Sequence, residues 1–228
     1  MTQVEVKTRI PYTVEIGHGL LASAGERVRA VCGGETAAVV SDDTVFSLYG
    51  AALCTQLEGA GYRVVPFVFP HGEASKNLST YAELVNFLAE KRLTRTDVLV
   101  ALGGGVTGDL GGFAAATYLR GIRYVQVPTT LLAAVDSSVG GKTAVDLPAG
   151  KNLAGCFHQP SIVLCDLDTL ATLPEQTFRD GCAEVIKYGM IDNAEFLRQL
   201  SETPAREQLE HVVTTCVRMK RDVVSEDE

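Results

Sequence analysis

The chain has 228 residues, 46% of them hydrophobic, and a formal net charge of −8 at pH 7; this is enough for one complete core and the beginning of a second. The negative charge argues against nucleic acid or an anionic membrane as a partner, and no apolar run approaches the ~20 residues that span a bilayer. The polar start at residues 1–6 lacks the basic and apolar regions of a signal peptide, so we expect a cytoplasmic protein.

Hydrophobic periodicity predicts alternating strands and helices through the first three quarters of the chain. It opens with a hairpin formed by 4–7 and 12–16. Further strands are expected at 36–41, 62–69, 97–102, 122–127 and 161–166. Helices are expected at 44–59, 77–91, 107–118 and 129–136. This order is typical of an α/β fold with a mostly parallel sheet.

The pattern changes at Pro174. Residues 175–200 and 205–224 both have helical spacing, and no further strand is indicated. We therefore place a domain boundary here, between an α/β domain at 1–174 and the beginning of a helical domain at 175–228.

Half of the glycines, 11 of 22, lie between Val98 and Gly155. The first of them follow the expected strand 97–102 and precede an expected helix. Glycines let the backbone approach a ligand closely, and the N-terminus of the following helix favours negative charge. We favour a nucleotide cradle here over the alternative, a tight structural turn.

The glycine spacing also fits the dinucleotide fingerprint, which requires an acidic residue after the next strand. The next expected strand ends instead in Pro-Thr-Thr at 128–130. A carboxylate follows the upstream strand 36–41, at Asp42, where it could hold an adenosine ribose. The ordinary Rossmann arrangement is therefore not expected.

A second glycine cluster at 136–143 imitates a P-loop. A P-loop requires glycine where Asp136 stands and a strand leading directly into the loop, whereas 129–135 is expected to be helical. A Walker nucleoside triphosphatase is thus not expected, and Lys142 remains a candidate anion contact. We expect Lys142 and Lys151 to lie in glycine-rich loops, which weakens the alternative that they are ordinary surface lysines.

The helical part begins with a charged cluster. Glu184, Lys187 and Tyr188 share one helical face. From the spacing alone, we favour a weak surface ion pair between the first two.

The cysteines are widely spaced and form no Cys-x-x-Cys pair. We expect free thiols, mostly in the core, and neither disulfides nor a zinc ribbon. They are Cys32, Cys54, Cys156, Cys165, Cys182 and Cys216.

Four segments together resemble the 3-dehydroquinate synthases, the metal- and NAD-dependent sugar-phosphate cyclases of the shikimate pathway. The segments are 72–76, 103–122, 128–152 and 181–187. The 128–152 block is specific to this family and its nearest cyclase relatives. Iron- and zinc-dependent alcohol and glycerol dehydrogenases share the fold without that block. The resemblance implies a Rossmann-like NAD-binding domain followed by an all-α metal and substrate domain.

The resemblance also implies cofactors and site residues. The cofactors are NAD+ and Zn²⁺ or Co²⁺. The implied NAD contacts are Asp42, Glu73, Lys76, Gly104, Gly105, Asp109, Thr129, Thr130, Lys142 and Lys151. The first three hold the adenosine end and the two glycines hold the pyrophosphate. The implied substrate-facing residues are Asp136, Lys142, Asn152, Glu184, Lys187 and, reaching across a homodimer, Arg120. Glu184 is also the implied metal ligand.

The implied reaction converts 3-deoxy-D-arabino-heptulosonate 7-phosphate into 3-dehydroquinate and phosphate. NAD+ oxidises a ring hydroxyl, phosphate is eliminated, the hydride returns, and ring opening precedes an intramolecular aldol step. Lys142 and Asn152 bind the phosphate. Asp136 and Lys187 orient hydroxyl groups, and no general base is assigned.

One departure from the family concerns the metal. Catalytic zinc takes about three protein ligands, and the family's two histidine ligands have no counterpart among the four histidines here. We therefore expect the chain to be part of a longer enzyme and inactive by itself. The alternatives are a non-catalytic NAD-binding fragment and a sister sugar-phosphate cyclase. The histidines, expected to be exposed or structural, are His18, His71, His158 and His211.

Overall fold

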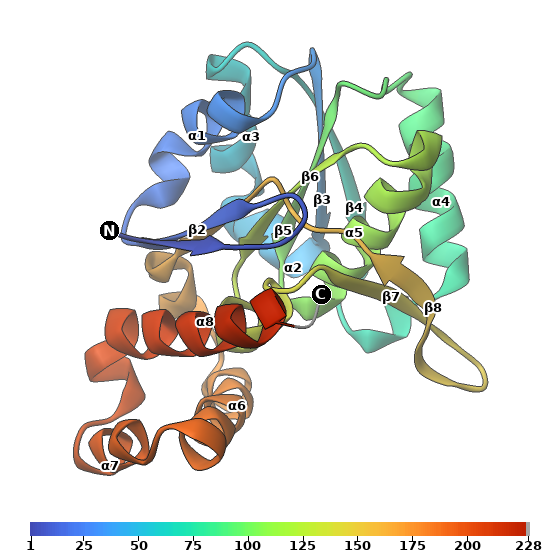
Figure 1. Ribbon diagram of the computed structural model, residues 1–228. Coiled ribbons are helices and arrows are strands. Elements are labelled where there is room, and N and C mark those ends of the chain that lie inside the picture. Colours follow the sequence, from blue (N-terminus) through green and yellow to red (C-terminus); the bar gives the residue numbers. More distant parts are fainter. Residues whose placement is uncertain (227–228) are drawn as a thin grey trace.

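A seven-stranded sheet forms the centre of the protein, in the order β1-β2-β9-β6-β5-β3-β4 (Figure 1). The structure is a computed structural model that describes residues 1–226. The strands are β1 (Thr2–Val6), β2 (Tyr12–Gly17), β3 (Thr36–Asp42), β4 (Arg63–Phe69), β5 (Val98–Gly103), β6 (Arg123–Pro128) and β9 (Ile162–Asp166). Every neighbouring pair is parallel except β1 with β2. The predicted α/β class is confirmed.

Helices cover both faces of the sheet. On one face lie α1 (Ala24–Val31) and α3 (Ala51–Gly59), and on the other lie α4 (Leu78–Glu90) and α5 (Gly105–Thr117) (Figure 1). Alternate strand residues face opposite sides, so Val39 packs with α1 and α3, whereas its neighbour Val40 packs with α4 and α5. Strands buried on both faces are nearly continuous apolar runs, which explains why the sequence predicts them well.

One helical segment precedes β3 in the chain and another follows it. The helix expected at 44–59 is confirmed as α2 (Asp43–Val45), the π-helical turn η2 (Phe46–Gly50) and α3 in succession. The 3₁₀ turn η1 (Leu20–Ser23) and α1 were not predicted. The other 3₁₀ or π-helical turns are η3 (Glu73–Ser75), η4 (Tyr118–Arg120), η5 (Ala133–Ser137), η6 (Leu167–Thr172) and η7 (Ala205–Gln208).

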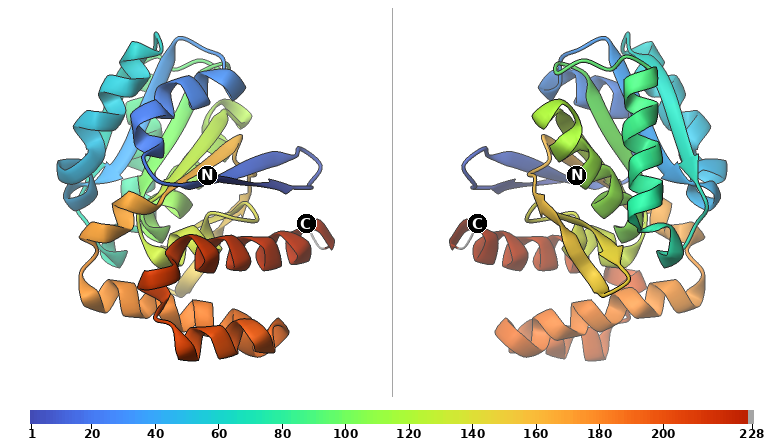
Figure 2. Two further views of the ribbon diagram at one scale, coloured as in Figure 1. Left: turned by 90° about the vertical axis from the view of Figure 1, so that its left-hand side faces the viewer. Right: turned by 90° about the vertical axis from the view of Figure 1, so that its right-hand side faces the viewer.

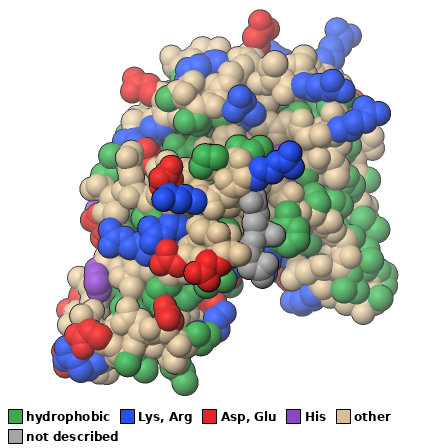
Figure 3. All heavy atoms as spheres, in the orientation of Figure 1, with side chains coloured by type: hydrophobic (Ala, Val, Ile, Leu, Met, Phe, Trp, Pro, Cys, Tyr) green, Lys and Arg blue, Asp and Glu red, His purple; other side chains and the backbone are tan. Residues whose placement is uncertain are grey.

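An antiparallel hairpin, β7 (Lys142–Leu147) with β8 (Gly150–Phe157), lies beside α5. These residues were predicted to be glycine-rich loops, and the structure corrects that prediction. Strand β8 is largely exposed and its apolar residues do not alternate regularly with polar ones, so its strand pattern is weak. A Cβ on Gly155 would lie 2.0 Å from the backbone oxygen of Thr143, so glycine allows the two strands to approach. In Figure 3, hydrophobic side chains gather on the side where α4 and the hairpin lie.

The last part of the described chain is helical. It contains α6 (Glu175–Asp192), α7 (Ala194–Glu202) and α8 (Leu209–Glu226), which lie together at one end of the molecule (Figure 2). The single helix expected at 175–200 is interrupted at Asn193, because its extended backbone ends α6. Its side chain then caps α7 by accepting a hydrogen bond from Phe196 N at 2.9 Å.

These helices share one hydrophobic cluster with the edge of the sheet. Phe178 of α6 and Val213 of α8 pack in it with Val4 and Val14 of β1 and β2. The boundary at residue 174 stays a prediction, and residues 227 and 228 of the expected helical domain lie outside the described residues. Within 1–226, no helix has the length and apolar character needed to cross a bilayer. All six cysteines are free, as predicted.

Candidate active site

The glycine turn and the upstream carboxylate meet at the carboxyl edge of the sheet. Strands β3 and β5 are parallel neighbours, with Ser41 opposite Leu102. The Ser41 hydroxyl donates to Leu102 O at 2.7 Å. The segments that follow the two strands leave on opposite faces, and such a switch point is where α/β sheets bind ligands. Asp42 and Gly104 therefore lie at one edge, as the sequence predicts.

The backbone of the turn after β5 is partly exposed at Gly104 and Gly105, and neighbouring side chains leave little room for a Cβ there. Gly104 precedes α5 and makes no side-chain cap. A Cβ there would lie 3.0 Å from Thr130 Cγ2, and one on Gly105 would lie 3.3 Å from Ser137 Oγ. The first N–H groups of α5 have no partner within the helix and lie at its positive end. The Thr129 hydroxyl oxygen nearby is buried without a partner among the described residues. This cradle fits a pyrophosphate.

A pocket of about 500 Å³ lies beside this turn, between the hairpin, η5 and α8. Four of the predicted site residues line it, together with Lys220, which was not predicted. Its charged and amide lining residues are Asp109, Asp136, Lys142, Asn152 and Lys220. The pocket thus combines two carboxylates with two ammonium groups and one amide.

Lys76 contacts two of the lining residues but does not itself line the pocket. It is only 5% exposed. Its ammonium pairs with Asp109 and donates to Asn152 Oδ1 at 2.5 Å. Burial raises the pKa of Asp109, although Lys76 acts to lower it. Lys76 therefore contacts both the expected cofactor side and the expected phosphate side of the site.

The hairpin loop is tied to the segment around Lys76. Asn152 has a left-handed backbone, φ 58°, and its N–H donates to Asp146 Oδ1 at 2.8 Å. Asp146 N in turn donates to Lys76 O at 2.8 Å. Lys151 pairs with Glu73 at 2.8 Å on the exposed surface, and this hydrogen bond raises the pKa of Lys151. Both predicted lysines of the block thus belong to strands, not loops.

Asp136 joins the pocket to the helical part. It accepts hydrogen bonds from Tyr188 of α6 at 2.8 Å and from Lys220 of α8 at 2.6 Å. Burial acts to raise the pKa of Asp136, but the hydrogen bond and charge of Lys220, with Tyr188 and Lys187, lower it overall. Asp136 is therefore ionised at neutral pH. Burial raises the pKa of Tyr188, which stays protonated as a donor.

Glu184 lies one turn before Tyr188 on α6. It forms the predicted ion pair with Lys187, whose pKa the contact raises. The Glu184 side chain is 17% exposed, whereas that of Lys187 is 54% exposed. Glu184 Oε1 is buried, and its contact among the described residues is the Lys187 ammonium. A carboxylate offers about four lone-pair sites, so this single contact leaves capacity for a further ligand.

Residues 66–180 match the family model described as 3-dehydroquinate synthase N-terminal, and residues 181–228 match the one described as 3-dehydroquinate synthase C-terminal. The chain belongs to the 3-dehydroquinate synthase family. The 3-dehydroquinate synthase of Caulobacter vibrioides is 52% identical over 225 residues, which are 95% of this chain and 60% of that protein. That of Clostridium acetobutylicum is 46% identical over 221 residues, 95% of this chain and 62% of that protein.

Solved structures extend the comparison to other cyclases. A 2-deoxy-scyllo-inosose synthase complexed with carbaglucose-6-phosphate, NAD+ and Co²⁺ has a TM-score of 0.89 and 30% identity, over 99% of this chain and 63% of that one. The 2-epi-5-epi-valiolone synthase of Streptomyces hygroscopicus, with NAD+ and Zn²⁺ bound, has a TM-score of 0.78 and 30% identity, over 99% and 62%. A butanol dehydrogenase of Thermotoga maritima, at 13% identity and a TM-score of 0.76, shares the fold alone.

Three of the substrate-facing residues implied by the 3-dehydroquinate synthase pattern do not line the pocket: Glu184, Lys187 and Arg120. Arg120 is exposed at the end of η4 and does not line the pocket. Its backbone is left-handed, φ 69°, directly after Leu119 at φ 50°. Two non-glycine residues in this region form a sharply turned corner that presents Arg120 outward.

A metal site of the 3-dehydroquinate synthase kind is not completed by the described residues. Within 1–226, no group of three or more His, Cys, Asp or Glu side chains is placed to hold a metal ion. Glu184 supplies a single carboxylate, whereas catalytic zinc takes about three protein ligands. The residues present therefore do not fit a whole zinc or cobalt site, and we derive no step through a metal.

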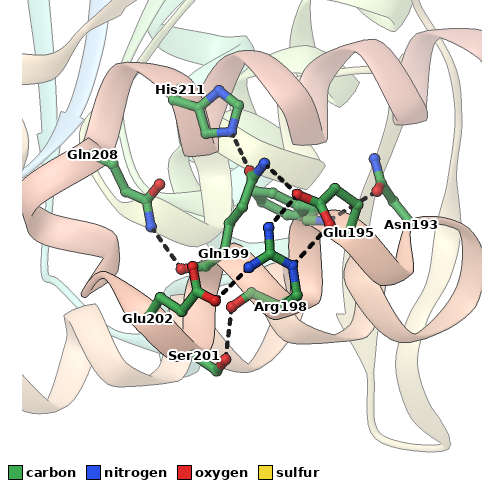
Figure 4. Close-up of polar contacts among 9 residues, drawn as sticks. Asn193, Glu195, Arg198, Gln199, Ser201, Glu202, Gln208 and His211 are labelled. Carbon is green, nitrogen blue, oxygen red and sulfur yellow. Dashed lines mark hydrogen bonds and ion pairs between the residues drawn. The ribbon is translucent and has the colours of Figure 1, made fainter.

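The four histidines make other contacts. His211 of α8 bonds Gln199 of α7 at 3.0 Å, beside the Arg198–Glu195 ion pair (Figure 4). The remaining three contact Asp168, Asp43 and the backbone oxygen of Ile122; they are His18, His71 and His158. This agrees with the exposed or structural roles that the sequence predicts.

Lys220 and Tyr188 are the site residues that sequence reasoning missed. The helical periodicity of the sequence places both residues on expected helices. It does not indicate that either side chain points toward the glycine-rich block. Only the packing of α6 and α8 against η5 brings them to Asp136. A positive residue on a helix of an acidic protein is too common a signal to have singled out Lys220.

Proposed function

We propose that the protein acts as a 3-dehydroquinate synthase, converting 3-deoxy-D-arabino-heptulosonate 7-phosphate into 3-dehydroquinate and phosphate. The observation that carries the proposal is the pocket in which Lys142 and Asn152 lie beside the glycine turn and Asp136. The chain spans 60 to 62% of the length of the two relatives described above. The activity, the substrate and the partners of the whole protein are therefore proposals.

NAD+ fits the carboxyl edge of the sheet. The N–H groups at Gly104 and Gly105 would hold its pyrophosphate, and Asp42 would accept hydrogen bonds from an adenosine ribose. Thr130, Asp109 and Thr129, whose hydroxyl oxygen has no partner among the described residues, would lie toward the nicotinamide end. Bound NAD+ supplies an acceptor for a hydride and returns it within one turnover.

The pocket residues bind and orient the substrate. Lys142 supplies a positive charge to the phosphate and Asn152 supplies directional N–H donors. Asp136, ionised and fixed by Tyr188 and Lys220, accepts hydrogen bonds from substrate hydroxyl groups. Lys187 contributes from the same side. These residues bring a phosphate-bearing ring into a single orientation, which lowers the barrier by pre-organisation.

We propose Glu184 as one ligand of the Zn²⁺ or Co²⁺ ion. Its buried carboxylate, which has only the Lys187 ammonium as an ion-pair partner among the described residues, supports that role, as do the metals named for the two related cyclases. The predicted homodimer, in which Arg120 reaches the neighbouring substrate phosphate, stays a prediction supported by the exposure of Arg120. The cytoplasmic location also stays a prediction.

A sister cyclase activity is the second candidate, because one of the solved cyclases is complexed with a different sugar-phosphate analogue, carbaglucose-6-phosphate. Relatives at 46 and 52% identity are 3-dehydroquinate synthases, whereas the other cyclases are 30% identical. This difference favours the heptulosonate phosphate as substrate.

Phosphate release tests the proposal. The protein encoded by the complete gene is incubated with NAD+, Zn²⁺ or Co²⁺, and either the heptulosonate phosphate or glucose 6-phosphate. We expect NAD-dependent release from the first substrate only. Release from glucose 6-phosphate alone would establish the sister activity instead. The 228-residue chain assayed in parallel tests the expectation that it is inactive by itself.

A further inference from the structure

We propose that Lys76 is a positioning residue: its buried ammonium fixes the Asn152 side chain so that the amide NH₂ group faces the anion pocket. The inference rests on the proposed function in taking that anion to be the substrate's phosphate. It assigns Lys76 a role on the substrate side, in addition to the NAD contact that the family resemblance implies.

The burial of Lys76 requires that its charge be compensated. At 5% exposure, the ammonium has lost most of its water, which is costly unless partners replace it. Asp109 supplies the opposite charge, and Asn152 Oδ1 supplies an acceptor at 2.5 Å. Lys76 is therefore held between these two side chains and does not extend into solvent.

The chemistry of the two groups decides which way the Asn152 amide points. A lysine ammonium has three donors and no acceptor, whereas an asparagine amide has one oxygen acceptor and one NH₂ donor. The atom that faces Lys76 must therefore be the oxygen. Because oxygen and nitrogen lie on opposite sides of Cγ, the NH₂ group is directed away from Lys76.

The backbone of the hairpin fixes the rest of the geometry. Asn152 has φ 58°, and its N–H is bonded to Asp146, whose own N–H is bonded to the backbone oxygen of Lys76. Asn152 lines the pocket with Lys142. With the oxygen directed to Lys76, the NH₂ group is left for the pocket, where it complements the charge of Lys142 as an anion donor.

Lys76 also balances the charge of Asp109, and a test must separate this effect from positioning. Asp109 lines the same pocket, and removing Lys76 alone would leave its carboxylate to repel an anion. Lys76→Met together with Asp109→Asn removes one positive and one negative charge at once. This double variant removes the Lys76–Asp109 ion pair and the hold on Asn152 but keeps the local net charge, and the comparison in the Asn152→Ala background isolates the hold on Asn152.

The experiment is calorimetric titration with inorganic phosphate, without NAD+, so that cofactor contacts do not contribute. Four proteins are compared: unsubstituted, Lys76→Met/Asp109→Asn, Asn152→Ala and the triple variant. We expect the double substitution to weaken phosphate binding about 10-fold or more when Asn152 is present and less than about 2-fold when it is alanine, since an oriented bond to a charged group is worth roughly 1.5 kcal/mol.

The positioning role would be overturned if the double variant bound phosphate as tightly as the unsubstituted protein. It would also be overturned if the double substitution weakened phosphate binding equally with Asn152 and with alanine at that position. If the unsubstituted protein binds no phosphate, the proposed anion pocket fails as well, so the two failures are distinguishable. Thermal unfolding verifies that each variant is folded.

A second measurement does not depend on the variants of Lys76. In the unsubstituted protein, the side-chain NH₂ resonance of Asn152 is identified by its absence from Asn152→Ala. We expect phosphate to shift this resonance. A resonance that stays unchanged at saturating phosphate would contradict the orientation that we infer.

Discussion

At the scale of single residues, lysine side chains neutralise the carboxylates of the pocket, which would otherwise repel an anionic ligand. Lys142 is exposed at the start of β7 and is free to meet an anion, whereas Lys76 and Lys220 are engaged with Asp109 and Asp136. The glycine cluster singles out Lys142, and the family resemblance implies Asn152, Asp109 and Asp136. The sequence could not predict which lysine neutralises which carboxylate, since those partners are 33 and 84 positions apart.

Replacement of Lys142 by alanine tests the anion contact. We expect phosphate affinity to fall about 10- to 100-fold, because a hydrogen bond to a charged group contributes roughly 1.5–3 kcal/mol. Lys151→Ala is the matched control: its side chain is 71% exposed and paired with Glu73, so phosphate binding should change less than about 2-fold. Equal losses for the two variants would refute the assignment.

Replacement of Lys220 by methionine tests the Asp136 network through stability. Lys220 keeps the pKa of Asp136 below its usual value, so the pair stabilises the fold above the unfolded-state pKa of about 4. That contribution is lost as the pH falls through the folded-state pKa. Without Lys220, burial opposes ionisation, and we expect a loss of about 1–3 kcal/mol at pH 7.

Urea unfolding at pH 7 and near pH 3.5 measures this difference. The loss in Lys220→Met should shrink at the lower pH, because the carboxyl group becomes protonated there. Lys187→Met, which removes a side chain that is 54% exposed, should cost less than about 1 kcal/mol at either pH. A pH-independent loss in Lys220→Met would contradict an electrostatic origin.

At the scale of elements, the sequence predicts buried strands far better than the hairpin. Strand β5 is buried at every position and therefore reads as an apolar run. Strand β8 has no fully buried position, so its pattern resembles a loop, and only its pairing with β7 defines it. The break at Asn193 was also missed, because the residues on both sides continue the same helical period.

Gly155→Ala tests whether the hairpin builds the pocket. The added Cβ would lie 2.0 Å from Thr143 O, so β7 and β8 must separate. We expect a loss of more than about 2 kcal/mol in unfolding free energy, together with weaker phosphate binding, because the hairpin carries Lys142 and Asn152. Gly33→Ala is the control, since its Cβ would meet nothing within 4 Å. If folded Gly155→Ala bound phosphate with unchanged affinity, the result would contradict a role of the hairpin in building the site.

At the scale of the whole molecule, the sheet places the cofactor cradle and the helical part completes the pocket. The sequence predicts the parallel sheet and the change to helices near residue 174. It does not predict that α6 and α8 pack in one cluster with β1 and β2, because that contact joins the two ends of the chain. The same packing brings Tyr188 and Lys220 to Asp136, so the site depends on both parts.

A crystal structure with NAD+ and inorganic phosphate tests most directly whether the glycine turn and the hairpin form one NAD and phosphate site. We expect the pyrophosphate at the N–H groups of Gly104 and Gly105, and the phosphate ion between Lys142 Nζ and the Asn152 NH₂ group, with Asn152 Oδ1 still on Lys76. Phosphate bound away from Lys142 and Asn152, or NAD+ bound away from the turn after β5, would contradict the proposed site.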